Sequence, residues 1–533
     1  MQRLILALIL CCTSTAFAQN AAPLLSNLVV THDPPTRSVT FDFDVSDADG
    51  DPLDLQLRVS GDSGKTWLVA LDSLVGDTGY PVTPGTGRSI VWTYNPNALA
   101  IAFGSGPIAL TGRIIADDRQ GVDIQDIVDQ VDSARVVERL MELEGVRDWQ
   151  VNAGAVQATR DTIAAWMVAA QLQEWHYNWQ QSIYSGRNLV GRIPGLTREA
   201  KTWMASGHYD SVNSPGADDN ASGTVGAIEA AVVLSDYHFA NSLRFICFDL
   251  EEEGLLGSIH YVQNRIPAWE NPAGLLNMEM IGYKDDAPNT QSLPTGFQQL
   301  FPAAYNAVAA DSFRGNFLTN VANVTSNPLK TAFDSCAAAY VPDLRVISLA
   351  APGNATIAPD LRRSDHAPFW DAGYQALMLT DGANLRNPYY HSPADTIGTL
   401  DLRFFVQNVR AVVATLAKLA EPMHADVLVG NPFVVNVPVG LAEGQEGATL
   451  TIYPNPSSGA VRFDYRGWGP GATRFRIFDS QGRLVAELEG NGGAGSVRWN
   501  GLGADGKRLA GGQYWVEMEQ EGKKLTQKLA LVR

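Results

Sequence analysis

Acidic side chains and histidines gather at the ends of four apolar segments, each of which predicts a strand. The segments are KTWMASG (201–207), SLRFICFDL (242–250), AGLLNMEM (273–280) and YQALMLT (374–380). The residues at or beyond their ends are His208, Asp210, Asp218, Asp219, Glu251, Glu252, Glu253, Glu279, Tyr390 and His391. The chain has only eight histidines, so two at such positions are informative. Imidazoles with several carboxylates are the ligands that zinc prefers, whereas imidazoles disfavour calcium.

Each of these residues, taken alone, also has a simpler explanation. Asp218 or Asp219 could cap the helix that begins near Ser222. Glu251–Glu253 could form a solvated turn, and His391 could be an ordinary loop histidine. Three adjacent glutamates after an apolar strand repel one another, however, unless cations lie nearby. The combination therefore predicts a metal site.

Helical patterns separate the four strands and predict the framework that positions this site. The segments 223–237 and 402–420 carry apolar residues at helical spacing. Strands that are apolar on both faces and alternate with helices predict an α/β domain, with a mainly parallel sheet covered by helices on both faces. Ligands of such sheets bind beyond the carboxyl ends of the strands, where the ionisable residues lie.

The chain, at 533 residues, is too long for one hydrophobic core, and its composition and hydrophobic pattern change along its length. The predicted segments are a signal peptide (1–18), a β-sandwich (20–132), the α/β domain (133–425), a Pro/Gly/Val-rich linker (426–448) and a second, Ig-like β-sandwich (449–533). The first sandwich resembles fibronectin-III-like or cadherin-like modules. Between two of its strands, Asp47, Asp49 and Asp51 could bind calcium or simply form a hairpin turn.

The N-terminal sequence MQRLILALILCCTSTAFAQN predicts an exported protein. It combines one arginine, a short apolar run and the small-residue sequence AFA, with cleavage expected after Ala18. The run is far shorter than the ~20 residues of a membrane span, and no later segment reaches that length. A lipid anchor at Cys11 or Cys12 is a weaker alternative, because the preceding LIL lacks a small residue.

Cleavage would leave two cysteines, Cys247 and Cys336. Export permits a disulfide between them, but Cys247 lies in an apolar run, where a buried free thiol is the simpler interpretation. The formal net charge of −18 is scattered along the chain and argues against a nucleic-acid or anionic-membrane partner. The sequence shows neither a nucleophile elbow nor a phosphate-binding loop.

Six motifs also carry a family resemblance. HYDS, GADDNASG, EEEGLLGS, NMEMIG, RSDHAPFWDAG and YHSPADT occur in the order seen in metallopeptidase family 28 of clan MH, the co-catalytic di-zinc aminopeptidases and glutamate carboxypeptidases. The likeness covers roughly 133–425 and includes NLVGRIPG (188–195), which is similar to the strand before the family's first ligand. The resemblance implies a zinc aminopeptidase fold, a peptide substrate and two zinc ions per chain.

The resemblance implies a role for each motif residue. Asp219 would bridge two zinc ions, one held also by Glu252 and His391, and the other by His208 and Glu279. The peptide bond after Asp219, to Asn220, is often cis in the family. The remaining implied roles are Asp210 as acceptor of the other ring N–H of His208, Glu251 as general base, Tyr390 as oxyanion donor, and Asp365 and His366 lining the substrate side.

One motif departs from the family pattern. Glu279 stands where the family usually has aspartate, so this carboxylate is one methylene longer and the second metal could shift or bind less tightly. The resemblance implies a secreted aminopeptidase, with the free α-amine of the substrate near Glu251 and Glu279. The alternatives are a carboxypeptidase using Arg362 and Arg363, a single-zinc glutaminyl cyclase, or a non-catalytic surface binding protein.

The C-terminal segment carries a second resemblance. YPNPSSG and WNGLGADGKRLAGGQYWV resemble the Ig-like modules that serve as type IX secretion sorting signals, and the related flagellar-hook-cap module. This resemblance implies export machinery as a partner and a secreted or cell-surface location. The alternative is a sandwich appended for stability.

Overall fold

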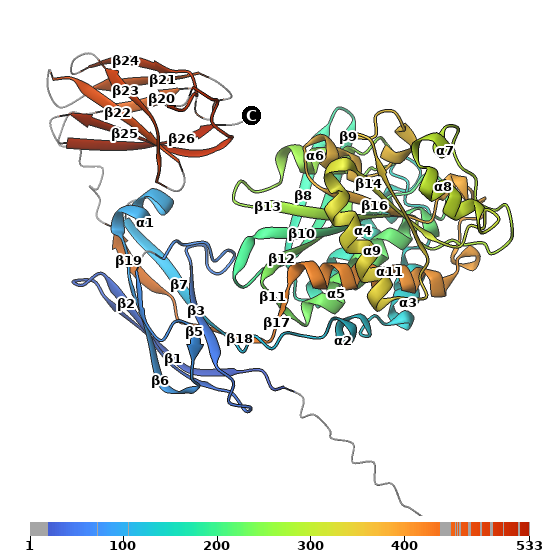
Figure 1. Cartoon of the computed structure of the whole chain (residues 1–533), viewed down its shortest axis with the longest axis horizontal. Coiled ribbons are helices and arrows are strands. Elements are labelled where there is room, and N and C mark those ends of the chain that lie inside the picture. The colour runs from blue at the N-terminus through green and yellow to red at the C-terminus, as the bar shows by residue number, and fades with distance from the viewer. Residues whose placement is uncertain are drawn as a thin grey trace, which may run out of the picture.

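The computed structural model describes residues 20–437, apart from 72 and 105, and residues 449–531 with short gaps. Those gaps are 454, 456, 458–459, 467–470, 480–481, 491–493, 505 and 521–522. The predicted signal peptide and most of the predicted linker lie outside the described residues. Figure 1 shows an α/β domain (cyan to orange) and two β-sandwich units, one blue and one red.

An eight-stranded sheet forms the centre of the α/β domain, in the order β15-β14-β16-β13-β10-β12-β9-β8. The strands are β8(Gln173–Gln181), β9(Tyr184–Ile193), β10(Arg198–His208), β12(Asn241–Phe248), β13(Asn271–Glu279), β14(Leu318–Asn323), β15(Val346–Ala351) and β16(Ala376–Thr380). The central strands β16, β13, β10 and β12 are parallel, as is the pair β14–β15. The pairs β14–β16, β12–β9 and β9–β8 are antiparallel. The sheet is therefore mixed, and the expectation of a mainly parallel sheet is not confirmed.

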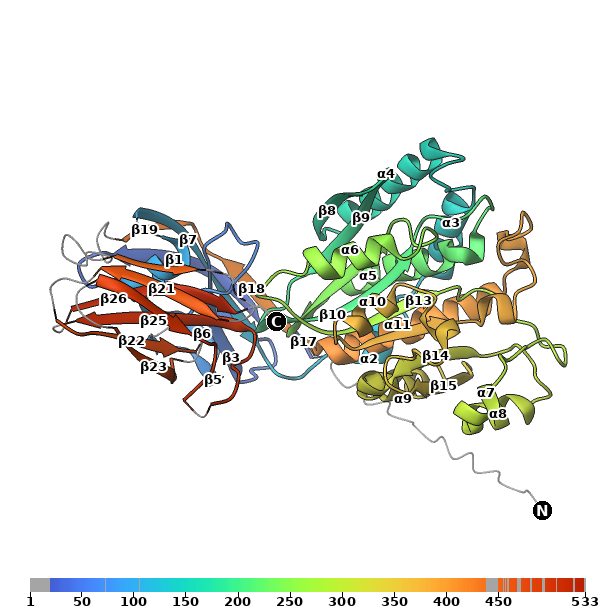
Figure 2. The same cartoon turned by 90° about the horizontal axis from the view of Figure 1, so that it is seen from above.

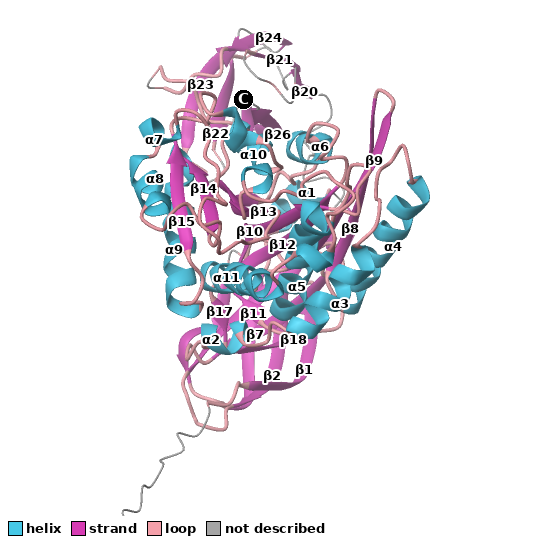
Figure 3. Cartoon of the chain, turned by 90° about the vertical axis from the view of Figure 1, so that its right-hand side faces the viewer, coloured by secondary structure: helices cyan, strands magenta, loops and turns pink. Residues whose placement is uncertain are grey.

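Helices cover both faces of this sheet (Figure 3). One face packs against α2(Ile124–Val128), α3(Ser133–Leu143), α4(Ala153–Ala169), α5(Gly223–Ser235), α9(Asn327–Tyr340) and α11(Leu402–Ala420). The other face packs against α6(Leu256–Asn264), α8(Pro302–Ala309) and α10(His366–Asp371), and α7(Phe297–Leu300) lies at its edge. Neighbouring residues of one strand enter opposite cores, because side chains alternate across a strand. Leu276 lies in the first core and Leu275 in the second.

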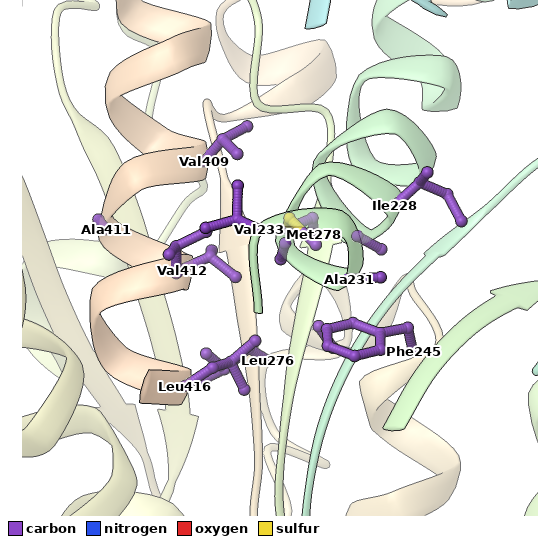
Figure 4. Close-up of a cluster of buried hydrophobic side chains, with 14 of the residues drawn as sticks. Ile228, Ala231, Val233, Phe245, Leu276, Met278, Val409, Ala411, Val412 and Leu416 are labelled. Carbon is purple, nitrogen blue, oxygen red and sulfur yellow. The ribbon is translucent and has the colours of Figure 1, made fainter. Parts of the chain in front are cut away.

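The first core holds the long helix α11 and the site-bearing helix α5 on the central strands. Figure 4 shows Val409, Val412 and Leu416 of α11 facing Ile228 and Ala231 of α5, with strand residues beside them. Burial of such aliphatic side chains stabilises each by roughly 1.5–3 kcal/mol. Cys247 and Cys336 are free thiols buried in this core, as the simpler interpretation predicted.

The N-terminal sandwich includes two strands that follow the α/β domain in the sequence. Its sheets are β1-β2-β6-β4 and β18-β7-β3-β5, with β19 also paired to β7. The elements are β1(Leu24–Asp33), β2(Ser38–Ser46), β3(Leu53–Ser60), β4(Leu74–Gly76), β5(Gly79–Val82), β6(Gly85–Thr93), α1(Pro96–Phe103), β7(Gly106–Asp117), β18(Ala425–Val429) and β19(Phe433–Val437). The α/β domain is thus inserted between β7 and β18.

Two predicted boundaries differ from the structure. Residues 425–429 and 433–437, mostly assigned to the linker, form strands that pair with β7, and β19 buries Phe433, Val435 and Val437 in the sandwich. Residues 124–128, assigned to the sandwich, form α2, which packs in the core of the α/β domain through Ile124 and Ile127. Both differences have the same cause. The apolar residues of each segment pack into the core of the domain that lies next to them in space, which the local sequence does not specify.

The sandwich contacts the α/β domain at the amino-terminal end of β10. Arg113 donates to the carbonyl oxygen of Leu196 at 3.2 Å, and the amide of Trp67 donates to the carboxylate of Glu199 at 2.7 Å. Arg192 forms a buried ion pair with the same carboxylate at 2.8 Å. Figure 2 shows the sandwich elements β3 and β18 beside this end of the domain. These contacts lie at the end of β10 opposite to His208.

The loop with Asp47, Asp49 and Asp51 forms a compact turn. One carboxylate oxygen of Asp47 accepts the amides of Asp49, Gly50 and Asp51 at 2.7–3.0 Å. These bonds support the turn interpretation of the aspartates, since one oxygen of Asp47 serves the backbone of the turn.

The C-terminal unit has two antiparallel sheets around its own core. Its strands are β20(Thr449–Tyr453), β21(Val461–Arg466), β22(Thr473–Phe478), β23(Leu484–Gly490), β24(Ala494–Trp499), β25(Gly512–Gln520) and β26(Lys523–Leu531).

A separate two-stranded ribbon in the α/β domain pairs β11(His238–Phe239) with β17(Pro422–Met423). Within the described part of the chain, no helix combines the length and apolarity that a membrane crossing requires.

Candidate metal centre

The predicted residues meet at the carboxyl edge of the central strands. His208 is the last residue of β10 and Glu279 the last of β13, while Glu251 and Glu252 follow β12 by three and four residues. Tyr390 and His391 lie in the loop after β16. Since parallel neighbours end at the same edge of a sheet, residues far apart in the chain come within contact distance.

The side chains form two clusters that share Asp219. In the first, Nε2 of His391 lies 3.0 Å from Oδ2 of Asp219 and 3.2 Å from Oε2 of Glu252. In the second, Nε2 of His208 lies 3.4 Å from Oδ1 of Asp219 and 3.5 Å from Oε2 of Glu279. The carboxylate of Asp219 thus turns one oxygen toward each imidazole, which is the arrangement that a bridging ligand requires.

Glu251 stands on the His208 side of the site. Its Oε2 lies 3.8 Å from Nε2 of His208. One carboxylate oxygen of Glu251, one ring nitrogen of His208 and one carboxylate oxygen of Glu279 all lie within 4.8 Å of one another. The structure therefore brings Glu251 as close to this cluster as a ligand would be. A base acting on a water held between the two clusters needs the same position.

The loop from 217 to 222 presents Asp219 to both clusters. It forms a single π-helical turn before α5, and Asp219 and Asn220 leave helical geometry, with φ of −105° and −131°. The Asp219–Asn220 peptide bond is cis, as the resemblance implied. The side chain of Asn220 accepts the amides of Gly223 and Met280 at 3.0 and 3.1 Å, which ties this loop to the end of β13.

Asp210 and Asp395 hold the loops of the site together. The two oxygens of Asp210 accept the amides of Glu251 and Glu252, each at 3.1 Å. Asp395 accepts the amides of Asp218 and Asp219 at 2.9 and 3.1 Å, joining the His391 loop to the Asp219 loop. Each buried carboxylate therefore fixes a neighbouring loop as well as adding negative charge.

The contact between Asp210 and His208 differs in detail from the expectation. Nδ1 of His208 lies 3.1 Å from the backbone oxygen of Asp210 and 3.4 Å from its carboxylate. The backbone carbonyl is thus the closer acceptor for a proton on Nδ1. Either acceptor leaves Nε2, which faces Asp219 and Glu279, free to bind a cation.

Glu279 reaches the site despite its extra methylene. Its Oε2 accepts the hydroxyl of Ser364 at 2.6 Å and lies 3.4 Å from the amide nitrogen of Asn220. Ser364 also accepts from Asn277 at 2.7 Å. This buried network sets the direction of the longer side chain, so the departure from the family pattern is accommodated by its neighbours.

Arg147 supports the site, and the sequence analysis missed it. Its guanidinium is buried and donates to the carbonyl oxygens of Tyr209, Pro215 and Gly216 at 2.7–2.8 Å. These three residues belong to the loop between His208 and Asp219. Arg147 lies outside every motif and its guanidinium binds backbone oxygens, so no sequence signal identified it.

The third glutamate of the acidic triplet points elsewhere. The carboxylate of Glu253 accepts the indole N–H of Trp149 at 2.8 Å and the hydroxyl of Tyr184 at 2.9 Å. The rings of Trp149 and Tyr184 lie edge to face, with centroids 5.2 Å apart. Glu253 thus joins two rim loops, whereas Glu251 and Glu252 face the site.

The electrostatics of the site favour bound cations. Burial raises the pKa of Glu251 well above its ordinary value, and it raises that of Glu252 to about 7, with the charge of Asp219 adding to the rise. Burial also acts to raise the pKa of Asp219, but the imidazoles of His208 and His391 outweigh it and leave the pKa below its ordinary range. So many carboxylates in a buried space need compensating positive charge.

The donor atoms also fit a metal ion. Nε2 of His208 and Oε1 of Glu252 are buried and have no hydrogen-bond partner within the described part of the chain. Buried polar atoms are usually paired, so unpaired atoms on two of the proposed ligands favour a bound cation at this site. One imidazole and two carboxylates on each side of that space match the donor set of zinc.

An apolar pocket opens beside the second cluster. Its polar lining includes Glu279, Arg363, Asn384 and Tyr390. Its apolar lining includes Leu293, Phe297, Val308, Phe317, Val321, Ile347, Leu349 and Met378. Most of these residues come from the region 283–365, in which no motif was recognised, so the sequence analysis did not identify them. The pocket can take one apolar side chain of a ligand that also reaches Glu279.

Asp365 and His366, expected on the substrate side, are both buried, and neither lines this pocket. Nε2 of His366 lies 2.9 Å from the backbone oxygen of Leu361, and its ring packs edge to face on Trp370 with centroids 4.4 Å apart. The structure therefore gives His366 a packing environment at the start of α10.

His366 is expected to make the domain sensitive to mild acid. Burial lowers its pKa from the ordinary 6.5 to about 4. As the pH falls, His366 is therefore protonated in the unfolded chain before it is protonated in the folded protein. The stabilisation present above pH 6.5 is lost as the pH falls toward 4. Between pH 7 and 5 this one group lowers the free energy of unfolding by roughly 2 kcal/mol.

Urea titrations at both pH values, on the wild type and on His366→Gln, measure this effect. The variant, which cannot take up the proton, is expected to lose less stability between pH 7 and 5 than the wild type. Equal losses in the two proteins would contradict the assignment of the acid sensitivity to His366.

Comparison with known proteins agrees with the geometry. Residues 188–416 match the model of peptidase family M28, and residues 451–532 match that of a secretion system C-terminal sorting domain. An uncharacterized protein of Escherichia coli, YfbL, is 32% identical over 222 residues, covering 39% of this chain and 64% of that protein. A probable leucine aminopeptidase 1 of Trichophyton verrucosum is 27% identical over 283 residues, covering 50% of this chain and 65% of that protein.

The chain thus spans slightly less than two thirds of the length of these relatives. Among solved structures, the Legionella pneumophila aminopeptidase LapA aligns with a TM-score of 0.44 and 19% identity, over 56% of this chain and 73% of that one. The family match contains all five predicted metal ligands, from His208 to His391. Residues 188–416 therefore carry a peptidase M28 domain, and residues 451–532 carry a secretion-system sorting domain, which indicates secretion or attachment to the cell surface.

Proposed function

We propose that this protein is an exported zinc-dependent aminopeptidase that removes N-terminal residues with apolar side chains from peptides. The observation that carries the proposal is the position of Glu279, which belongs both to the His208 cluster and to the wall of the apolar pocket. A substrate whose first side chain fills that pocket would have its α-amine and first carbonyl group near the two clusters.

The cofactor proposed is zinc, two ions per chain. Asp219, Glu252 and His391 would hold one ion, and His208, Asp219 and Glu279 the other. When bound, the ions would polarise the substrate carbonyl and lower the pKa of a water molecule. The unpaired Nε2 of His208 and Oε1 of Glu252 support this assignment.

The chain's own residues would move the proton. Among the residues that the structure describes, the one ion pair of Glu251 is the contact with His208, and its buried carboxylate holds a proton more readily than an ordinary glutamate. It would take a proton from the attacking water and deliver it to the nitrogen of the leaving amine. The phenol of Tyr390, which lines the pocket, would donate a hydrogen bond to the carbonyl oxygen as negative charge develops there.

The charges around the pocket favour a free amine over a free carboxylate. Glu251 and Glu279 present negative charge where the N-terminal ammonium group would lie. The carboxypeptidase alternative needs arginines at the pocket, but Arg362 is paired with Asp371 at 2.6 Å and does not line it. Arg363 does line it, with Nη2 bound to Tyr390 and Nη1 bound to Asn384, so only one arginine of the pair stands at the pocket.

The Glu279→Asp variant tests this proposal together with the wild type. The shorter side chain would withdraw from both Ser364 and His208, so we expect weaker binding of one zinc ion, on the order of tenfold, and a parallel loss of turnover. Zinc content is measured by mass spectrometry on the chain from residue 19, and turnover with leucine p-nitroanilide. N-acetyl-leucine p-nitroanilide, which lacks the free amine, is the matched substrate control.

Two zinc ions in the wild type, with chelator-sensitive turnover of the free-amine substrate alone, would support the proposal. A Glu279→Asp variant that binds zinc and turns over as well as the wild type would contradict the expectation that the site needs the longer side chain of Glu279. A wild type with one zinc ion that cyclises an N-terminal glutaminyl peptide, without hydrolysing leucine p-nitroanilide, would replace the proposal by the cyclase alternative.

A further inference from the structure

Two adjacent arginines, Arg362 and Arg363, have entirely different partners. Arg362 donates to the backbone oxygen of Asn354 at 2.7 Å and pairs with Asp371 at 2.6 Å. Arg363 lines the apolar pocket, and its Nη2 donates to the hydroxyl oxygen of Tyr390 at 3.0 Å. Only the second arginine therefore touches a residue of the proposed catalytic site.

The contact decides which way the phenol of Tyr390 can donate. A guanidinium has donors only, so the hydroxyl oxygen of Tyr390 must be the acceptor in this bond. The hydroxyl proton of Tyr390 then has to point away from Arg363. A tyrosine without such a partner could rotate its proton toward any acceptor nearby, including the carboxylates of the site.

Both partners are held in place from their other sides. The second guanidinium nitrogen of Arg363, Nη1, donates to the side-chain oxygen of Asn384 at 3.1 Å. The ring of Tyr390 stacks on His391 with centroids 3.8 Å apart and 18° between the planes. Arg363, Asn384 and Tyr390 all line the pocket with Glu279. The series of hydrogen bonds from Asn384 through Arg363 to Tyr390 thus ends where the substrate carbonyl group would lie.

We propose that Arg363 is a positioning residue, which fixes the phenol of Tyr390 and keeps its hydroxyl proton directed at the carbonyl oxygen of the substrate. This inference rests on the proposed aminopeptidase function, since it needs a carbonyl group in the pocket. Arg363 acts through Tyr390 and not on the substrate itself. Its positive charge also makes the phenol a stronger hydrogen-bond donor.

A double-mutant cycle tests this coupling. The variants are Arg363→Gln, Tyr390→Phe and the combination of the two, with Arg362→Gln as the matched control. Because Arg363 is exposed and Arg362 lies outside the pocket, we expect all four variants to fold, which circular dichroism and urea titration check. Turnover of leucine p-nitroanilide gives kcat and KM separately, and a leucine-derived boronic acid, a tetrahedral analogue, gives a binding constant without turnover.

We expect Tyr390→Phe to lower kcat about 100-fold, as loss of one oxyanion donor does, and Arg363→Gln to lower it about tenfold with KM little changed. The double variant is expected to match Tyr390→Phe alone, since Arg363 has no function without the phenol. The affinity for the boronic acid should follow the same pattern. Arg362→Gln should behave like the wild type.

Multiplied losses in the double variant would contradict the inference, because Arg363 would then act independently of Tyr390. An Arg363→Gln variant with wild-type kcat and affinity would also overturn it. Both results leave the aminopeptidase function intact if the wild type is active. A wild type that neither hydrolyses the substrate nor binds the boronic acid would instead refute the proposed function.

Discussion

Asp219→Asn is expected to leave the protein folded but without bound zinc and without peptidase turnover. The two oxygens of Asp219 lie 3.0 Å from Nε2 of His391 and 3.4 Å from Nε2 of His208, so this carboxylate is the link between the clusters. An amide keeps the volume but has one oxygen and no charge. Both proposed metal positions lose a ligand at once, and turnover should fall to the background rate.

The adjacent residue provides the control. Asp218 is also buried, but its carboxylate accepts the amide of Gly282 at 2.9 Å and the side chain of Asn387 at 2.7 Å, away from both imidazoles. Burial and the nearby Asp381 raise its pKa well above the ordinary value, so the neutral Asp218→Asn should be tolerated. Metal content by mass spectrometry and turnover should stay near wild type. Zinc retained in Asp219→Asn would contradict the bridging role.

The centre of the fold could be predicted from the sequence because its strands are buried on both faces. Every residue of β12, for example, is buried, and a run such as LRFICF, apolar except for Arg244, predicts this environment from the local sequence. The outer strands are different. The directions of β14 and β9 depend on how the chain returns to the sheet, and β19 pairs with a strand about 320 residues earlier. Local pattern contains no such information.

The same distinction separates the parts of the site. His208, Glu252 and Glu279 could be identified because each lies at or just past the end of an apolar strand, where the fold class predicts ligands. Arg147 and Ser364 could not, because they act through the backbone or through another side chain. The apolar pocket was also missed, since Phe297, Phe317 and Leu349 come from separate elements whose packing no local motif encodes.

Glu251→Gln is expected to keep both zinc ions and lose nearly all turnover. Glu251 is not needed to complete either ligand set, since His391, Glu252 and Asp219 form one and His208, Glu279 and Asp219 the other. Glutamine matches its size but cannot accept and return a proton. We expect kcat to fall roughly 10³-fold, within the range for a lost general base, with KM little changed.

The neighbouring glutamate makes this test specific. Glu253 is in the same acidic triplet, but its carboxylate is bonded to Trp149 and Tyr184, so Glu253→Gln should keep most of the activity. Zinc content distinguishes the two roles that the geometry allows for Glu251, which groups with His208 and Glu279 within 4.8 Å. A variant that loses one zinc ion together with turnover would make Glu251 a ligand. Full zinc content with turnover lost would make it the base, because only proton transfer has then been removed.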